Sequence, residues 1–185
     1  IYDDELFEPE SALEVYREVL ALDGENLTAV RGLGRAGERA RSYADVVDSL
    51  ERESSLSPVI EAKAYLLIRA GDVAATRMGD TERAQHLYRR ALVAAPENRA
   101  ALEGLVAVLL KLGRWEALLE VHHEELKLIT SDSDRSRLLL RMGEIAETRA
   151  GNHGEAARLY REALAADSRN LAARRALVRR LKLDG

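Results

Sequence analysis

Apolar residues recur every three or four positions along most of this chain, and no stretch alternates in the manner of a β-strand. The pattern predicts ten helices, at residues 9–22, 26–39, 42–54, 58–78, 80–95, 97–112, 114–128, 134–150, 152–166 and 169–183. Pro9, Pro58 and Pro96 lie at helix starts, where the missing N–H is harmless. Asp80 and Asn152 each follow a turn glycine, at the position of an N-cap. Because the connections are short, we expect consecutive helices to pair as antiparallel hairpins.

The chain also repeats itself at a 72-residue offset. The stretches Ala64–Leu102 and Ser136–Arg174 match at 18 of 39 positions without a gap. Within them, the matched pairs include Gly71 and Gly143, Gly79 and Gly151, Tyr88 and Tyr160, and Asn98 and Asn170. A period of this length indicates stacked helical units, each burying its apolar face against its neighbours.

Each 72-residue block consists of two unequal hairpins. Gly79 and Gly113 are 34 positions apart, whereas Gly113 and Gly151 are 38 positions apart. Three of the extra residues fall in the connection 129–134, and we expect another inside the helix that follows it. An extra residue in a helix is commonly absorbed as a π-bulge or a wider last turn.

We therefore predict one solenoid segment over residues 1–185, with about five hairpins in double units of 34 + 38 positions. Both ends are expected to cut a repeat. Ile1–Leu6 aligns with Val73–Met78, the last turns of a helix, and Asp184 aligns with Leu112, where another helix ends.

The spacing of small and aromatic residues resembles that of the tetratricopeptide repeat family over essentially the whole chain. The first copy carries the family pattern as Leu67, Ala70, Gly71, Ala74, Ala84, Tyr88 and Pro96, and the second as Leu139, Met142, Gly143, Ala146, Ala156 and Tyr160. The resemblance implies an all-α solenoid of antiparallel hairpins wound as a right-handed superhelix, of the kind found in long bacterial arrays. It also implies a non-catalytic scaffold for protein–protein interaction.

Composition narrows the functional classes further. Hydrophobic residues make up 46% of the chain, which is enough for a core, but only 4% is aromatic, so Ala, Leu and Val must do most of the packing. The net charge of −4 does not fit a general nucleic-acid binder. The absence of cysteine excludes disulfides and cysteine-based zinc sites. No apolar run is long enough for membrane insertion. Lysine is rare among the basic residues, which favours a bacterial gene of high G+C content. Separately, we expect a cytoplasmic location.

Two motifs suggest chemistry that their context does not support. The run Gly32–Gly37 reads G-x-G-x-x-G, but a dinucleotide-binding turn needs a preceding strand, and the 72-residue offset places this run inside a helix. His122 and His123 precede two glutamates, yet neighbouring helical residues point about 100° apart and do not chelate one ion. His122 falls on the aromatic packing position. With no nucleophile or phosphate-loop motif present, we expect no enzyme activity, cofactor, metal or small-molecule substrate.

In tetratricopeptide arrays the first helix of each hairpin lines a concave groove, and the resemblance places five ridges there. They are Thr28, Arg31, Arg35 and Glu38; Tyr65, Ile68 and Asp72; Ala100, Glu103, Ala107 and Leu110; Arg137, Leu140, Glu144 and Glu147; and Ala172, Arg175, Arg179 and Lys182. The expected partner contacts are Arg31, Arg35, Tyr65, Asp72, Glu103, Arg175, Arg179 and Lys182. Such a groove, basic at both ends, fits a protein or peptide segment with acidic ends. The alternative is that these are solvated residues in local ion pairs worth under about 1 kcal/mol.

The sequence also bears on three other modes of action. The Lys/Asn clamp of chaperone-binding family members is missing, since all four asparagines lie at helix starts or turns. A second interpretation makes the chain a docking arm of a larger multidomain protein, using its convex or edge surface for a folded partner such as a small GTPase or an assembly component. Repeat-based RNA binding would require a basic groove throughout, whereas the middle ridges are acidic.

Overall fold

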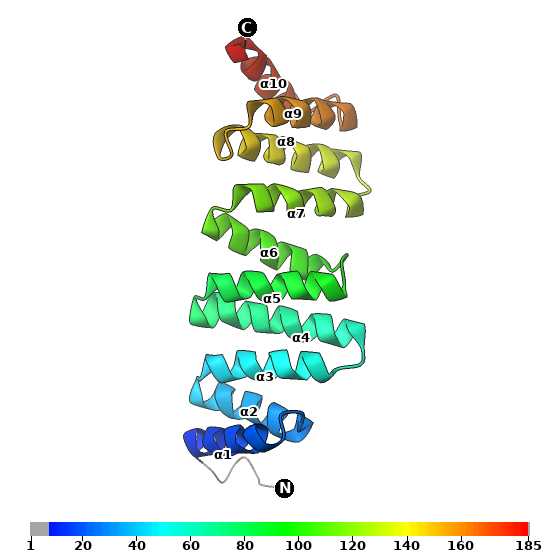
Figure 1. Cartoon of the computed structure of the whole chain (residues 1–185). Helices are drawn as coiled ribbons and strands as arrows, with labels where there is room; N and C mark the ends of the chain where they lie inside the picture. Colours follow the sequence, from blue (N-terminus) through cyan, green and yellow to red (C-terminus); the bar gives the residue numbers. More distant parts are fainter. Residues whose placement is uncertain (1–7, 185) are drawn as a thin grey trace. The chain divides into compact units, whose positions relative to one another are not determined.

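A computed structural model describes residues 8–184, which form ten α-helices and no strand (Figure 1). The helices are α1 (Pro9–Leu22), α2 (Leu27–Ala40), α3 (Tyr43–Leu56), α4 (Ile60–Val73) with the π-helical segment η1 (Ala74–Met78), α5 (Thr81–Ala94), α6 (Arg99–Leu112), α7 (Trp115–Leu128), α8 (Asp132–Thr148), α9 (His153–Ala166) and α10 (Leu171–Asp184). All their boundaries lie within two residues of the predicted ones. The predicted cut repeat at Ile1–Leu6 lies outside the described residues.

The described residues divide into two compact units, and the division falls inside α6, between Val108 and Leu109. Within each unit, consecutive helices pair as antiparallel hairpins in chain order (Figure 1). The predicted all-α solenoid of helix hairpins is therefore confirmed. We call α2, α4, α6, α8 and α10 the A helices, and α1, α3, α5, α7 and α9 the B helices. The grouping into one segment of 34 + 38 double units stays a prediction.

The hairpins pack by placing a B-helix tyrosine against an A-helix glycine. A Cβ atom on Gly71 would lie 2.8 Å from the ring of Tyr88, and one on Gly104 would lie 2.5 Å from the same ring. In the second unit a Cβ on Gly143 would lie 2.4 Å from the ring of Tyr160. Both tyrosines are buried. Each glycine thus provides the space that a tyrosine ring occupies between helices.

The glycine-rich run of α2 has the same packing role. A Cβ on Gly32 would lie 2.3 Å from the ring of Tyr16, and one on Gly34 would lie 2.5 Å from the Ser49 hydroxyl oxygen. The whole run lies within α2, and α1 precedes it. The G-x-G-x-x-G motif is therefore a helix surface fitted against α1 and α3, and not a dinucleotide-binding turn.

The extra residue predicted inside α8 widens the last turn of that helix, and α4 with η1 shows the same widening. In the first unit the backbone over Ala74–Met78 is π-helical, and the Asp80 N–H donates to the Ala74 carbonyl at 2.9 Å. In the second unit the Asn152 N–H donates to the Ala146 carbonyl at 2.8 Å, across the same number of residues. Both A helices accommodate the insertion in this way.

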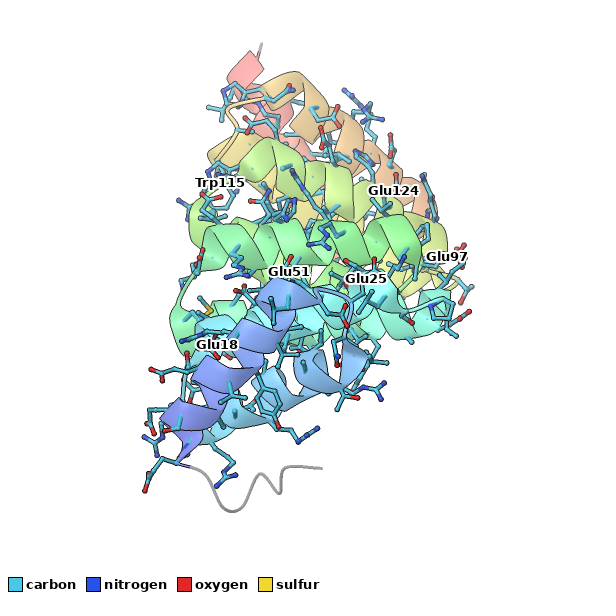
Figure 2. The ribbon with its side chains drawn as sticks, turned by 60° about the horizontal axis from the view of Figure 1, so that its bottom comes forward. Glu18, Glu25, Glu51, Glu97, Trp115 and Glu124 are labelled. Carbon is cyan, nitrogen blue, oxygen red and sulfur yellow. The ribbon has the colours of Figure 1, made fainter. Side chains whose placement is uncertain are left out.

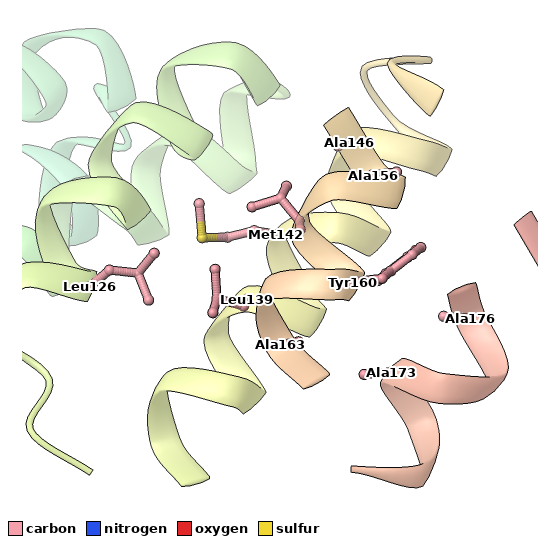
Figure 3. Packing of buried hydrophobic residues seen from close by; sticks show 10 residues of the cluster. Leu126, Leu139, Met142, Ala146, Ala156, Tyr160, Ala163, Ala173 and Ala176 are labelled. Atoms are coloured by element: carbon pink, nitrogen blue, oxygen red, sulfur yellow. The ribbon is translucent and has the colours of Figure 1, made fainter. Parts of the chain in front are cut away.

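The core of the second unit is built largely from alanine, with a few larger side chains between α8 and α9. Leu139, Met142 and Tyr160 are fully or almost fully buried there, and Leu126 of α7 packs against the same cluster (Figure 3). Within residues 8–184, none of the helices combines the length and apolar character needed to cross a lipid bilayer.

Candidate functional site

The first unit contains a hollow of about 250 Å³ between α2, α3 and α4, which we call the arginine hollow. It is lined by Arg31, Gly34, Arg35, Glu38, Val46, Ser49, Leu50, Glu53 and Arg69. The structure thus brings the predicted contacts Arg31 and Arg35 together on one face of α2. The third arginine, Arg69, comes from α4, the next A helix.

An ion pair and an aromatic ring position two of the three arginines of this hollow. The Arg31 Nε donates to the Glu53 carboxylate at 2.7 Å, although the Arg31 side chain is still 55% exposed. The Arg69 guanidinium lies 6.0 Å from the ring centroid of the predicted contact Tyr65, within cation–π range. Three arginines face two glutamates, Glu38 and Glu53, so the lining carries one net positive charge.

Arg69 is the residue of this site that sequence reasoning missed. The predicted ridge of α4 included Ile68, but Ile68 is only 9% exposed and packs into the core. The inward position of Ile68 turns the next residue, Arg69, outward into the hollow. The available signal was the spacing of Tyr65 and Arg69, because residues four apart share one helix face.

The other two predicted contacts of the first unit already have partners. Asp72 accepts a hydrogen bond from the Tyr88 hydroxyl at 2.7 Å. Burial and the neighbouring Asp72 carboxylate raise the pKa of Tyr88. The Glu103 carboxylate lies 3.3 Å from Arg99 on the same helix, and both side chains are well exposed. Asp72 therefore orients a packing tyrosine, and Glu103 belongs to a solvated local ion pair.

The B helices of the first unit are joined by ion pairs of their own. Arg17 of α1 donates to Asp45 of α3 at 2.6 Å, and Arg83 of α5 donates to Glu51 of α3 at 2.7 Å. Arg90 also donates to Glu51, which Figure 2 labels. Burial raises the pKa of Glu51, but the hydrogen bonds from Arg83 and Arg90 outweigh it and lower the pKa below its usual value. The arginines and carboxylates that join α1, α3 and α5 therefore largely neutralise one another.

In the second unit, Glu147 connects α8, α9 and α10. Its carboxylate accepts hydrogen bonds from the Tyr160 hydroxyl at 2.9 Å and from Arg179 at 2.7 Å, and it lies 3.8 Å from Arg180. Burial raises the pKa of Glu147, but the bonds from Tyr160 and Arg179 outweigh it and hold the pKa below its usual value. Arg179, a predicted partner contact, therefore also fastens α10 to the α8–α9 hairpin.

The remaining predicted contacts, Arg175 and Lys182, share an exposed face of α10 with Arg179. An open hollow of about 590 Å³ lies on this face, lined by Arg174, Arg175, Val178, Arg179, Lys182 and Leu183. Neither Arg175 nor Lys182 forms a hydrogen bond or ion pair with another side chain that the structure describes. Charge reversal at Arg175 is thus a cleaner probe of binding than reversal at Arg179.

The two adjacent histidines of α7 occupy different environments. His122 is buried at the aromatic packing position, as predicted, and its Nδ1 lies 2.8 Å from the Glu125 carboxylate. Its Nε2 is buried without a hydrogen-bond partner. The His123 Nε2 lies 4.0 Å from Glu155 of α9, at a partly exposed position. Among the described residues, no three His, Asp or Glu side chains are grouped in a way that would hold a metal ion.

The buried histidine predicts a loss of stability on acidification. Burial lowers the pKa of His122 below its ordinary value of 6.5, despite the favourable charge of Glu125, while Arg141 and His123 lower it further. Below pH 6.5 the unfolded chain therefore binds more protons than the folded chain, and the free energy of unfolding falls as pH falls. We expect denaturant midpoints to drop between pH 7 and pH 5.5, and to drop less in His122→Phe.

The exposed His86 on α5 provides the matched control, so His86→Gln should keep the pH dependence of the original chain. An equal drop in His122→Phe and the original chain would show that other groups cause the effect.

A family model described as tetratricopeptide repeat matches residues 33–140, and a second model of the same description matches residues 8–53. Similar solved structures include a MamA protein with 18% sequence identity, which covers 88% of this chain and 85% of that chain at a TM-score of 0.51. Another MamA structure also has 18% identity and covers 88% of this chain and 91% of that chain, at a TM-score of 0.50. The structure of YrrB, titled a TPR protein with an unusual peptide-binding site, has 18% identity, 91% and 82% coverage, and a TM-score of 0.49. No curated protein matches the sequence. At these identities the MamA structures support the fold alone.

Proposed function

Because the chain belongs to the tetratricopeptide repeat family, we propose that it is a non-catalytic scaffold that binds a segment of a partner protein along its A helices. The observation that carries this proposal is the arginine hollow, where guanidinium groups from α2 and α4 surround one cavity. We propose that the hollow receives an acidic side chain of the partner. The exposed Arg175 and Lys182 provide a second basic surface in the second unit.

The chemistry of the hollow favours a carboxylate over other groups. A guanidinium group presents its N–H donors in a planar fork that matches the two oxygens of a carboxylate. Arg35 of α2 and Arg69 of α4 bring guanidinium groups into the lining from two helices, where both can meet an entering carboxylate. Val46 and Leu50 lie buried in the same lining and provide apolar contact beside the charges.

The rigidity of the helix array explains how such a site works without catalysis. Stacked hairpins hold the arginines in place before the partner arrives, so little ordering of the scaffold accompanies binding. The proposal includes no cofactor, metal, nucleic acid or small-molecule substrate. A bacterial, cytoplasmic protein stays an expectation.

Selection from a displayed library of random 12-residue peptides tests this proposal. We expect the selected peptides to be rich in Asp and Glu. The Arg35→Glu, Arg69→Glu double variant should bind them roughly ten- to a hundredfold more weakly, since a hydrogen bond to a charged group contributes about 1.5–3 kcal/mol.

The matched control is the double variant Arg89→Glu, Arg161→Glu, which makes the same charge change at exposed positions of B helices. Equal weakening in both double variants would show that net charge, and not the hollow, governs binding. Selected peptides without acidic residues would refute the proposed chemistry.

A further inference from the structure

A second surface of the first unit exposes aliphatic side chains at the edge where B helices end and A helices begin. Figure 1 shows the α3–α4 and α5–α6 connections at the same edge of this unit. Val59 is 52% exposed, Ile60 59% and Val93 84%. Ile60 and Val93 line a hollow of about 560 Å³, which we call the edge hollow, and Val59 directly precedes Ile60 in the chain. The lining consists of Ser54, Ser55, Ile60, Lys63, Leu67, Arg90, Val93 and Ala94. This hollow is separate from the arginine hollow.

The second copy of the repeat carries a larger side chain at one position of this lining. At the 72-residue offset, Ser54 corresponds to Leu126 and Leu67 corresponds to Leu139. In the second unit, Leu126 is only 6% exposed and belongs to the same core cluster as Leu139 (Figure 3). In the first unit, the Ser54 hydroxyl instead folds back and donates to the Glu51 carbonyl at 2.7 Å. Ser54 itself is only 1% exposed and Leu67 only 3%, so both form the covered floor of the edge hollow, at positions where the second copy has leucines.

The rim of the hollow has also changed from polar to apolar. Val59 takes the place of Ser131, whose hydroxyl caps α8 by accepting the Asp134 N–H. Val59 cannot accept such a bond, and α4 has no side-chain cap. Ile60 likewise takes the place of Asp132. The first copy therefore lacks the side-chain helix cap and exposes two aliphatic side chains. Exposed aliphatic side chains of this kind are typical of a surface that a partner covers.

Positive charge at the same rim defines the partner's chemistry. Lys63 takes the place of Arg135, whose guanidinium donates to a backbone carbonyl of α7. Lys63 has no hydrogen bond or ion pair within the described part of the chain. Arg90, the other cation in the lining, is held by Glu51. A partner that covers the aliphatic rim must also neutralise Lys63, which favours a carboxylate beside its apolar side chain.

We propose that the edge hollow docks a partner segment that inserts one leucine-like side chain between α3, α4 and α5 and places a carboxylate beside Lys63. This site is distinct from the arginine hollow, so we propose that one scaffold holds two separate parts of one partner.

Selection on a variant without the arginine hollow tests this inference. The full chain carrying Arg35→Glu and Arg69→Glu is screened against displayed 16-residue random peptides. We expect enriched peptides that contain Leu or Ile within four residues of Asp or Glu. This variant lacks Arg35 and Arg69, so the result does not depend on whether the arginine hollow binds an acidic segment.

Two variants place the selected peptides in the hollow. Ser54→Leu enlarges a buried side chain at the floor of the hollow to the leucine of the second copy, and Val93→Glu changes an exposed residue of the lining. Each should weaken peptide binding at least about tenfold. The control Ala165→Glu makes the rim change at the equivalent exposed position of the second copy and should leave binding unchanged.

Three outcomes would overturn the inference. The first is the absence of any enriched peptide, and the second is binding that Ser54→Leu and Val93→Glu leave unchanged. The third is a dimer of the chain, seen by sedimentation, that Val93→Glu converts to a monomer, because the hollow would then belong to a second copy.

Discussion

Replacing Gly143 with leucine is expected to destabilise the second unit by about 3 kcal/mol, near the upper end for overpacking a core. The new Cβ would lie 2.4 Å from the Tyr160 ring, which is fully buried and held by its hydrogen bond to Glu147. Because the buried Tyr160 ring cannot move away from the new side chain, α8 and α9 must move apart. Urea denaturation followed by far-ultraviolet circular dichroism measures the effect.

Gly154→Leu is the control, because a Cβ at Gly154 has only the Asn152 side-chain oxygen within reach, at 3.9 Å. It should leave the denaturation midpoint unchanged or raise it slightly, since leucine favours helix more than glycine does. Equal midpoints for the Gly143 and Gly154 variants would contradict the packing role. Gly71→Leu and Ala84→Leu should destabilise the first unit in the same direction.

Removing the Glu147 carboxylate is expected to cost about 2–3 kcal/mol of stability. Glu147→Ala takes away the group that faces Tyr160, Arg179 and Arg180, while the Arg180 side chain stays only 8% exposed. Glu147→Gln should cost less, because an amide oxygen still accepts from Tyr160. The exposed Glu144 lies on the same helix, and Glu144→Ala is the matched control with an expected change near zero.

The same carboxylate predicts a second loss of stability at low pH. The folded-state pKa of Glu147 lies below its ordinary value of 4.5, so its contribution is complete above pH 4.5 and disappears as pH falls through the lower folded value. In Glu147→Gln the free energy of unfolding should therefore fall less steeply with decreasing pH below 4.5. An equally steep fall in both proteins would show that Glu147 does not contribute.

The helices and their pairing followed from the sequence because the physics that sets them is local and repeated. Each helix shows its apolar period, its start signal and its 72-residue counterpart, as the Tyr160–Gly143 contact and its counterpart between Tyr88 and Gly71 illustrate. The position of His122 in the core also followed from the repeat. These features depend on spacing, and spacing is visible in a sequence.

The candidate sites were less predictable because they depend on side chains that meet across helices. Arg31 and Arg35 were predicted from α2, but Arg69 joins them only because Ile68 turns into the core. The partner of Arg179 likewise comes from another helix, at Glu147. No pattern within one helix specifies such pairings.

The edge hollow had a signal in the sequence, although of a different kind. It appears only when the two copies are compared position by position, with Ser54 in the place of Leu126 and Ile60 in the place of Asp132. Matches between copies establish a repeat, whereas mismatches at core positions show where one copy has changed its role. The division of the chain inside α6 had no comparable signal.

The most direct test of the proposed function is a map of where an acidic partner segment binds. Amide chemical shifts of the isotope-labelled chain are followed while a selected acidic peptide is added. The arginine hollow predicts the largest changes at residues 31–38, 49–53 and 65–72, from α2, α3 and α4. Changes confined to α5 or α9, with α2 and α4 unaffected, would contradict binding along the A helices.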